Sequence, residues 1–145
     1  MKYRIYLDNC CFNRPYDDQT NLLVFLETEA KLFIQELVYT GKLLLVWSFV
    51  LEYENAANPF DERKHSISAW KKLSITDCDL CEEISYNARK LLKTGLRQKD
   101  ASHIACAMYA SADFFITTDK KILNKSVQGI ILINPIDFVR RYLHE

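Results

Sequence analysis

Residues 43–47 (LLLVW) form an unbroken run of apolar residues. A strand that is apolar at every position, without alternation, is typical of a sheet that is covered on both faces. Three further short segments fit strands: residues 2–7, which alternate before they become apolar, residues 114–117 and residues 130–133. Segments with helical spacing separate these strands, and such alternation of strand and helix predicts a mostly parallel sheet.

The helices between the strands are predicted from apolar residues spaced three or four apart and from the residues that begin or end helices. Ser48 is placed to cap a short helix that Asn58-Pro59 ends. The other expected helices cover residues 21–39, 61–73, 79–93, 99–109, 119–124 and 135–143. We therefore expect one domain over residues 1–145 of the α/β class, a three-layer α/β/α sandwich around a mostly parallel, about five-stranded sheet.

Composition narrows the range of functions. The 19 basic and 19 acidic residues cancel, which argues against a general polyanion binder but leaves room for a small acidic site with a local basic rim. No apolar run approaches the roughly 20 residues that span a bilayer, and the N-terminus lacks the features of a signal peptide. We therefore expect a cytoplasmic protein with no membrane partner.

Acidic residues follow three of the expected strands. Asp8 ends the first strand, Glu52 and Glu54 lie in the helix after the second, and Asp119 lies just beyond the third. Asp100 begins the helix that precedes the third strand. Taken singly, each acid is more often a cap, a turn residue or a solvated helix position. Because parallel strands end at one edge of a sheet, however, we expect these carboxylates to converge there.

A cluster of carboxylates predicts a cation. The charges repel and raise one another's pKa values unless a positive charge compensates them. Oxygen ligands suit hard divalent ions such as Mg²⁺ or Mn²⁺. Ions of this kind supply a water nucleophile and stabilise charge that develops on a phosphate, so the cluster indicates metal-dependent phosphate chemistry.

Four segments together resemble a known family. They are YLDNCCFN (6–13), WSFVLEYENAANP (47–59), QKDASHIACAMYASADFFITTDKKIL (98–123) and ILINPIDFV (131–139), and in order and spacing they are similar to the PIN-domain ribonucleases. The resemblance covers nearly the whole chain. Its most specific part is Asp-Ala-x-x-x-Ala-x-Ala from Asp100 onward, followed by a strand and Thr-x-Asp at residues 117–119.

This resemblance implies an activity and a site. PIN-domain proteins of this size are Mg²⁺- or Mn²⁺-dependent ribonucleases that hydrolyse RNA phosphodiester bonds, often the toxins of toxin–antitoxin pairs. The expected partners are thus an RNA substrate, an antitoxin protein and a second copy in a homodimer. The resemblance implies an acidic catalytic and metal site of Asp8, a glutamate after the second strand, Asp100 and Asp119, with Asn9 and Thr117 as polar supports.

The choice between Glu52 and Glu54 follows from helix geometry. Residues two apart on a helix point about 200° from each other, so only one of them can face the site. In the family pattern a serine at the strand end precedes the glutamate by six positions, and Ser48 then favours Glu54. Glu52 remains the alternative, because a short helix can shift by a residue.

Two basic or titratable residues near the acids have competing interpretations. Arg14, expected in a polar loop past Asp8, could bind a substrate phosphate or pair with Asp17 or Asp18. His103 lies three positions after Asp100, but a histidine in an alanine-rich helix is more often a packing residue than a ligand.

Two other functions fit the same residues. A non-catalytic PIN-like module would bind nucleic acid without cleaving it. A metal-dependent phosphatase of another α/β family could use an aspartate at the end of its first strand, but Cys10 stands where such an enzyme would carry a second acid.

Overall fold

A five-stranded sheet forms the centre of the computed structural model, which describes residues 2–145. The strand order is β3-β2-β1-β4-β5, and all four neighbouring pairs are parallel. The predicted α/β class is therefore confirmed, with a sheet that is parallel throughout. The strands are β1 (Arg4–Leu7), β2 (Leu44–Ser48), β3 (Ser74–Cys78), β4 (Phe114–Ile116) and β5 (Ile131–Ile133).

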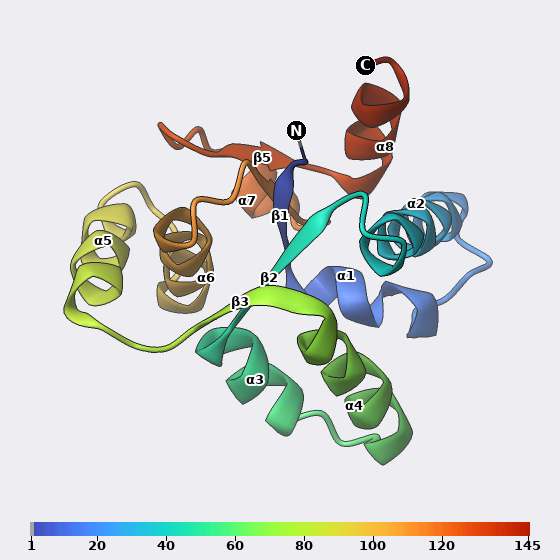
Figure 1. Ribbon diagram of the computed structural model, residues 1–145, viewed down its shortest axis with the longest axis horizontal. Helices are drawn as coiled ribbons and strands as arrows, with labels where there is room; N and C mark the ends of the chain where they lie inside the picture. Colours follow the sequence, from blue (N-terminus) through green and yellow to red (C-terminus); the bar gives the residue numbers. More distant parts are fainter. Residues whose placement is uncertain (1) are drawn as a thin grey trace.

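Helices cover both faces of this sheet. Figure 1 shows α2 (Leu22–Tyr39) and α8 (Pro135–Leu143) together on one side, and α5 (Glu82–Leu92) and α6 (Gln98–Tyr109) together on the other. The remaining elements are α1 (Asn9–Asn13), α3 (Phe49–Ala56), α4 (Asp61–Ser68), α7 (Lys120–Leu123) and two 3₁₀ turns, Arg14–Tyr16 and Ala69–Leu73.

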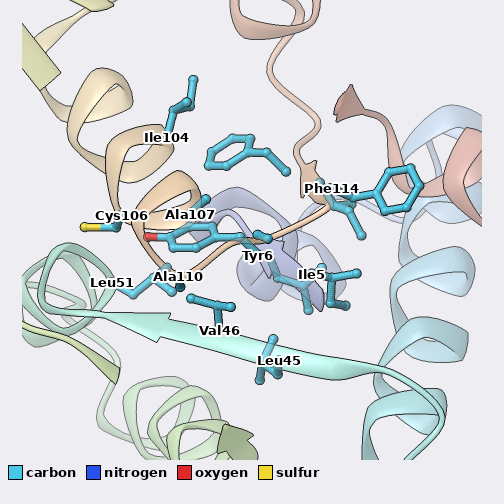
Figure 2. Close-up of a cluster of buried hydrophobic side chains, with 14 of the residues drawn as sticks. Ile5, Tyr6, Leu45, Val46, Leu51, Ile104, Cys106, Ala107, Ala110 and Phe114 are labelled. Atoms are coloured by element: carbon cyan, nitrogen blue, oxygen red, sulfur yellow. The ribbon is translucent and has the colours of Figure 1, made fainter. Parts of the chain in front are cut away.

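The core forms where the central strand meets these helices. Tyr6 is fully buried and points from β1 toward α6, where Ala107 leaves room for its ring (Figure 2). The Tyr6 ring stacks on Phe115 of β4, with ring centroids 5.2 Å apart. On the opposite face Phe114 packs edge-on against Phe138 of α8, at 5.1 Å. Successive side chains of a strand thus pack against the helices on opposite faces of the sheet.

The strand order contains a topological switch point. From β1 the chain crosses through α2 to β2 and then reaches β3, farther out on the same side. It next returns through α5 and α6 to β4, on the other side of β1. In open parallel sheets ligands bind at such a point, outside the carboxyl ends of the strands. The C-terminal ends of β1 and β4 therefore mark the expected position of a site.

The structure adds one strand that the sequence pattern did not locate. Four strands were placed and about five expected, and the missing one is β3 (Ser74–Cys78). It is an edge strand of mostly polar residues, and its one large apolar side chain, Ile75, is 44% exposed. Backbone pairing with β2 holds this strand in the sheet, and such pairing does not require apolar side chains. The sequence therefore contains no apolar run that would reveal β3.

Two expected segments also differ locally. The chain after Asp8 is not a loop but the short helix α1, which Asp8 caps by accepting a hydrogen bond from the Asn9 backbone N–H. The helix expected over residues 61–73 ends as an α-helix at Ser68 and continues as a 3₁₀ turn. Short-range caps and turns of this kind depend on a few hydrogen bonds and leave little periodicity.

In residues 2–145, none of the helices combines the length and the apolar character that a bilayer crossing requires.

Lys31 is a lysine buried on the inner face of α2, and its burial should affect the stability of the protein. It is 6% exposed, and its ammonium lies 6.0 Å from the centre of the Phe12 ring. Burial lowers the pKa of Lys31 from 10.5 to about 8, although the neighbouring Cys11 opposes this shift. The folded protein therefore releases a proton at a pH where the unfolded chain still holds it. The free energy of unfolding should rise with pH between about 8 and 10.5, and below pH 8 the full cost of burying the charge applies.

We expect Lys31→Met to raise the free energy of unfolding at pH 7 by about 1–3 kcal/mol, because methionine fills the same space without a charge. The gain should shrink when pH is raised to about 10, where the wild-type lysine is already neutral. Urea unfolding of both proteins at the two pH values, under reducing conditions, measures this. Lys42→Met, at an exposed lysine, is the control. If Lys31→Met raises the free energy of unfolding equally at both pH values, the pKa of Lys31 is not lowered by burial.

Candidate active site at the C-terminal edge of the sheet

A polar pocket of about 390 Å³ lies at the C-terminal ends of β1 and β4. It contains all four acids for which the sequence predicted convergence, with Glu54 as the glutamate. Its lining consists of Asp8, Asn9, Cys10, Glu54, Arg97, Lys99, Asp100 and Asp119.

Asp8 is held at the floor of the pocket by the backbone of two strands and by a threonine. Its N–H donates to the carbonyl of Ile116 at 2.9 Å, which joins the ends of β1 and β4. The Thr117 hydroxyl donates to one carboxylate oxygen of Asp8 at 2.9 Å, and the backbone N–H of Asn9 donates to the other at 2.8 Å. The thiol of Cys10 also approaches the carboxylate, at 3.5 Å. Asp8 is 6% exposed, so these donors replace most of its hydration.

Glu54 and Glu52 point in different directions from α3, as the helix geometry requires. Ser48 caps α3 by accepting from the Leu51 N–H at 3.2 Å, and this sets the register of the helix. Glu54 lines the pocket. Glu52 instead accepts a hydrogen bond from the Trp47 indole at 3.0 Å on the other side of the helix. The register that Ser48 favoured thus brings Glu54 to the site.

A buried chain of polar groups reaches Glu54 from the core. The Tyr6 hydroxyl lies 2.6 Å from the Ser48 hydroxyl and 2.5 Å from Nδ1 of His103. The other ring nitrogen of His103, Nε2, hydrogen-bonds to Glu54 and lies 3.7 Å from the Asp8 carboxylate. Burial raises the pKa of Tyr6 well above its ordinary value, so its hydroxyl stays protonated. Each polar group of this network therefore has a partner, and His103 contacts both Glu54 and Asp8.

The neighbours of Glu54 keep it ionised. Burial by itself would raise the pKa of Glu54, but the hydrogen bond and charge of His103 outweigh burial, and Lys99 adds to the effect. The Lys99 ammonium lies 3.7 Å from the Glu54 carboxylate. The net result is a pKa below the ordinary value, so Glu54 is a carboxylate at neutral pH.

Asp100 and Asp119 share one arginine. Asp100 lies in the first turn of α6, and Asp119 caps α7 by accepting from the Lys121 N–H at 2.9 Å. The Arg97 guanidinium lies 3.4 Å from Asp100 and 3.3 Å from Asp119. Burial raises the pKa of Asp100, and the neighbouring Asp8 charge raises it further, against the opposing effect of Arg97. Arg97 therefore compensates the charge of Asp100 only in part.

The donor set fits a divalent cation. One oxygen each of Asp8 and Glu54 and a ring nitrogen of His103 lie within 4.8 Å of one another. Asp100 and Asp119 lie outside this tight group but line the same pocket. The buried side-chain oxygen of Asn9, also in the lining, has no hydrogen-bond partner in the part of the chain that the structure describes. Carboxylates with an unpaired amide oxygen offer the oxygen ligands that Mg²⁺ and Mn²⁺ prefer, and an imidazole nitrogen is an additional candidate.

Arg14 and Asn9 differ from their expected roles as a substrate-binding residue and as a side-chain support for Asp8. Arg14 does not line the pocket: it pairs with Asp17 at 2.9 Å and approaches the buried Glu27 at 3.3 Å. Asn9 lines the pocket, but it supports Asp8 through its backbone N–H instead of its side chain. Thr117 does support Asp8 through its side chain.

The sequence interpretation overlooked Arg97 and Lys99, which supply the positive charge of the pocket. Their one sequence signal is that both shortly precede Asp100, at the start of α6. It also treated His103 mainly as a packing residue, whereas His103 both packs and contacts the acids.

Comparison with known proteins identifies the fold. No family model and no curated protein matches the sequence. Among solved structures, the chain is similar to a chain of VapBC2 from Rickettsia felis, from a crystal structure of VapBC2 bound to a DNA fragment from their promoter. The TM-score is 0.58 at 15% sequence identity, over 90% of this chain and 98% of that chain. The chain thus has the PIN-like fold that the sequence resemblance implied.

The raised pKa of Asp100 means that Asp100→Asn should not destabilise the metal-free protein. Because the folded-state pKa is raised, the ionised carboxylate disfavours the fold at neutral pH, and this cost disappears as pH falls through that pKa. In EDTA the variant should unfold at the same temperature as the wild type or slightly above it, whereas most substitutions destabilise. Added Mn²⁺ should raise the melting temperature of the wild type more than that of the variant.

Asp113→Asn is the matched control for this comparison. Asp113 accepts from the Arg4 N–H at 2.8 Å, at the opposite edge of the sheet, so this variant should keep the full Mn²⁺-induced rise. If Asp100→Asn melts several degrees lower in EDTA and keeps the full rise, Asp100 is a structural residue and not part of the metal site.

Proposed function

We propose that this protein is a divalent-metal-dependent endoribonuclease that hydrolyses RNA phosphodiester bonds. The observation that carries the proposal is the meeting of Asp8, Glu54, Asp100 and Asp119 in one pocket, at the switch point of a parallel sheet. The PIN-like fold supports it, since the resemblance in sequence assigns the same four acids to the site of a ribonuclease.

The acids would hold one or two ions, with Asp8 and Glu54 as ligands of the tight group. When bound there, Mg²⁺ or Mn²⁺ supplies an activated water nucleophile and positive charge that stabilises the phosphate in the transition state. The protein's own part is to fix the ligands before substrate arrives. Thr117 orients Asp8, and His103, held by Tyr6, orients Glu54. Such preorganised contacts avoid reorganisation during the reaction.

Arg97 and Lys99 give the pocket a cationic rim. Their side chains are 67% and 56% exposed, so they are accessible to an incoming phosphate while they pair with the acids. A phosphodiester that approaches the acidic floor is repelled by the carboxylates, and these two cations offset that repulsion at the entrance. We assign them to substrate binding.

We further propose that the protein acts as the toxin of a toxin–antitoxin pair and binds an antitoxin or a second copy of itself. Small PIN-like proteins often have this role, and the similarity to a chain of VapBC2 supports it. The surface offers an apolar face for such a partner. On α2, the exposed side chains include Leu22, Leu26 and Phe33, spaced along one side of the helix.

The first test of the function is cleavage itself. The purified protein should cut single-stranded RNA in Mg²⁺ or Mn²⁺, and EDTA should abolish the activity because the carboxylates then hold no ion. Gel analysis of a labelled oligonucleotide measures this. Activity that persists in excess chelator would rule out the metal mechanism. RNA binding without cleavage would favour the non-catalytic module, and hydrolysis of a phosphate monoester alone would favour the phosphatase.

The second test uses the two glutamates of α3 as a matched pair. Glu54→Gln should lower the rate of cleavage at least tenfold, about 1.4 kcal/mol in barrier, because it removes a charged ligand but keeps the shape of the side chain. Glu52→Gln, at a glutamate that contacts Trp47 and Lys71, should change the rate less than twofold. The opposite ranking would place the site on the other side of α3.

A further inference from the structure

The acidic pocket adjoins two further hollows of different chemistry, and each shares lining residues with it. One, of about 300 Å³, shares Arg97 and Asp100 with the pocket and adds Lys121 and Lys125. The other, of about 540 Å³, shares Lys99 with the pocket and lies between α3 and α6. A chain molecule that crosses the acidic pocket would therefore meet cations on one flank and the second hollow on the other.

The second hollow has an aromatic wall. Its lining is Phe49, Val50, Tyr53, Gln98, Lys99 and Ser102. Tyr53 is 73% exposed, on a helix that is anchored by the buried residues Val50, Leu51 and Asn55. Phe49 is only partly buried and packs against the core, so the hollow combines a fixed apolar floor with an open tyrosine ring.

Two helices present neighbouring faces to the two cavities. On α3, Glu54 faces the acidic pocket and the preceding residue, Tyr53, faces the hollow. On α6, Asp100 faces the acidic pocket, Gln98 and Ser102 face the hollow, and Lys99 borders both. The two cavities are thus neighbours, because adjacent residues of each helix line one or the other.

We propose that Tyr53 stacks on the nucleobase adjacent to the phosphate that the acidic pocket receives, which makes the hollow between α3 and α6 a base-binding subsite for single-stranded RNA. This inference rests on the proposed function, because the acidic pocket defines where the phosphate lies. Aromatic side chains beside a cationic groove are the usual platform for unpaired bases. Gln98 and Ser102 provide donors and acceptors next to the base edge, and Lys99 lies between base and phosphate.

An RNA strand is the occupant that explains all three cavities together. The cationic flank suits backbone phosphates, the acidic centre suits a metal-neutralised phosphate, and the aromatic flank suits a base. A volume of about 540 Å³ is within the range of pockets that hold small planar ligands. A duplex would keep its bases paired and could not present one to Tyr53, so the subsite selects single-stranded substrate.

The test measures coupling between Tyr53 and one base. Binding of a labelled RNA hexamer is followed by fluorescence anisotropy in EDTA, which prevents cleavage, and every protein carries Glu54→Gln to reduce the repulsion between the pocket and the phosphate. The RNA is either intact or abasic at one position, and each of its positions is tried in turn. In the Glu54→Gln protein, one abasic position should weaken binding about tenfold, as expected for the loss of one stacked base.

The Tyr53 variants should then separate stacking from other contacts. Tyr53→Phe keeps the ring and should keep the tenfold penalty for the abasic RNA. Tyr53→Ala should bind the intact hexamer about tenfold more weakly and show no further penalty at the abasic position. Tyr39→Ala, at a tyrosine of α2 that is 71% exposed, is the control and should behave like the Glu54→Gln protein. Thermal melts verify that each variant is folded.

The inference is overturned if Tyr53→Ala binds the intact hexamer as the Glu54→Gln protein does, which is also the result expected if the hollow accepts a protein side chain instead. It is equally overturned if the abasic penalty persists in Tyr53→Ala. Cleavage by the wild-type protein is a separate readout. Coupling between Tyr53 and one base without cleavage would support the subsite and contradict the nuclease function. Cleavage without that coupling would support the nuclease function and contradict the subsite.

Discussion

Parallel pairing on both sides of β1 determines where everything else in this protein can lie. Because β2 and β4 both run parallel to β1, their C-terminal ends meet at one edge of the sheet. The backbone bond from Asp8 to Ile116 joins two of these ends directly. The pocket occupies this edge at the switch point of the strand order, where the connecting helices diverge and leave room for a ligand.

Four carboxylates at that edge repel one another, and the surrounding basic residues offset this repulsion only in part. Arg97 lies between Asp100 and Asp119, and His103 and Lys99 contact Glu54. Asp100 keeps a raised pKa despite its arginine, because burial and the charge of Asp8 act against ionisation. A site with this residual excess of negative charge is suited to a divalent cation, which would compensate what the protein's own cations leave.

The polar chain Ser48–Tyr6–His103 connects the site to the centre of the core. Tyr6 contributes its ring to the stack with Phe115 and its hydroxyl to the hydrogen bonds beneath Glu54. A buried polar network is stable only when its members are paired, and here the partners come from β1, β2 and α6. The same contacts that hold these three elements together therefore hold Glu54 and His103 in position.

Apolar runs and helical periodicity were sufficient to predict the mostly parallel α/β sandwich and the convergence of Asp8, a glutamate of the helix after the second strand, Asp100 and Asp119. These features follow from local rules, since a strand buried on both faces must be apolar throughout and parallel strands must end together. The preference for Glu54 over Glu52 came from the family resemblance, in which a serine at the strand end precedes the glutamate by six positions, and the Ser48 cap of α3 is consistent with that register. What the sequence determined by itself is thus the fold class and the edge at which the acids meet.

The tertiary structure decided the features that depend on residues far apart in the chain. The edge strand β3 exists through its pairing with β2, and its polar sequence alone does not specify it. Tyr6 and His103 are 97 residues apart, so no local pattern reveals that they bond each other and support Glu54. The contact of Arg14 with Glu27, and the hollow beside Tyr53, also appear only once the helices have packed. Local propensity acts over a few residues, whereas a site is defined by distances between side chains that only the packed fold brings together.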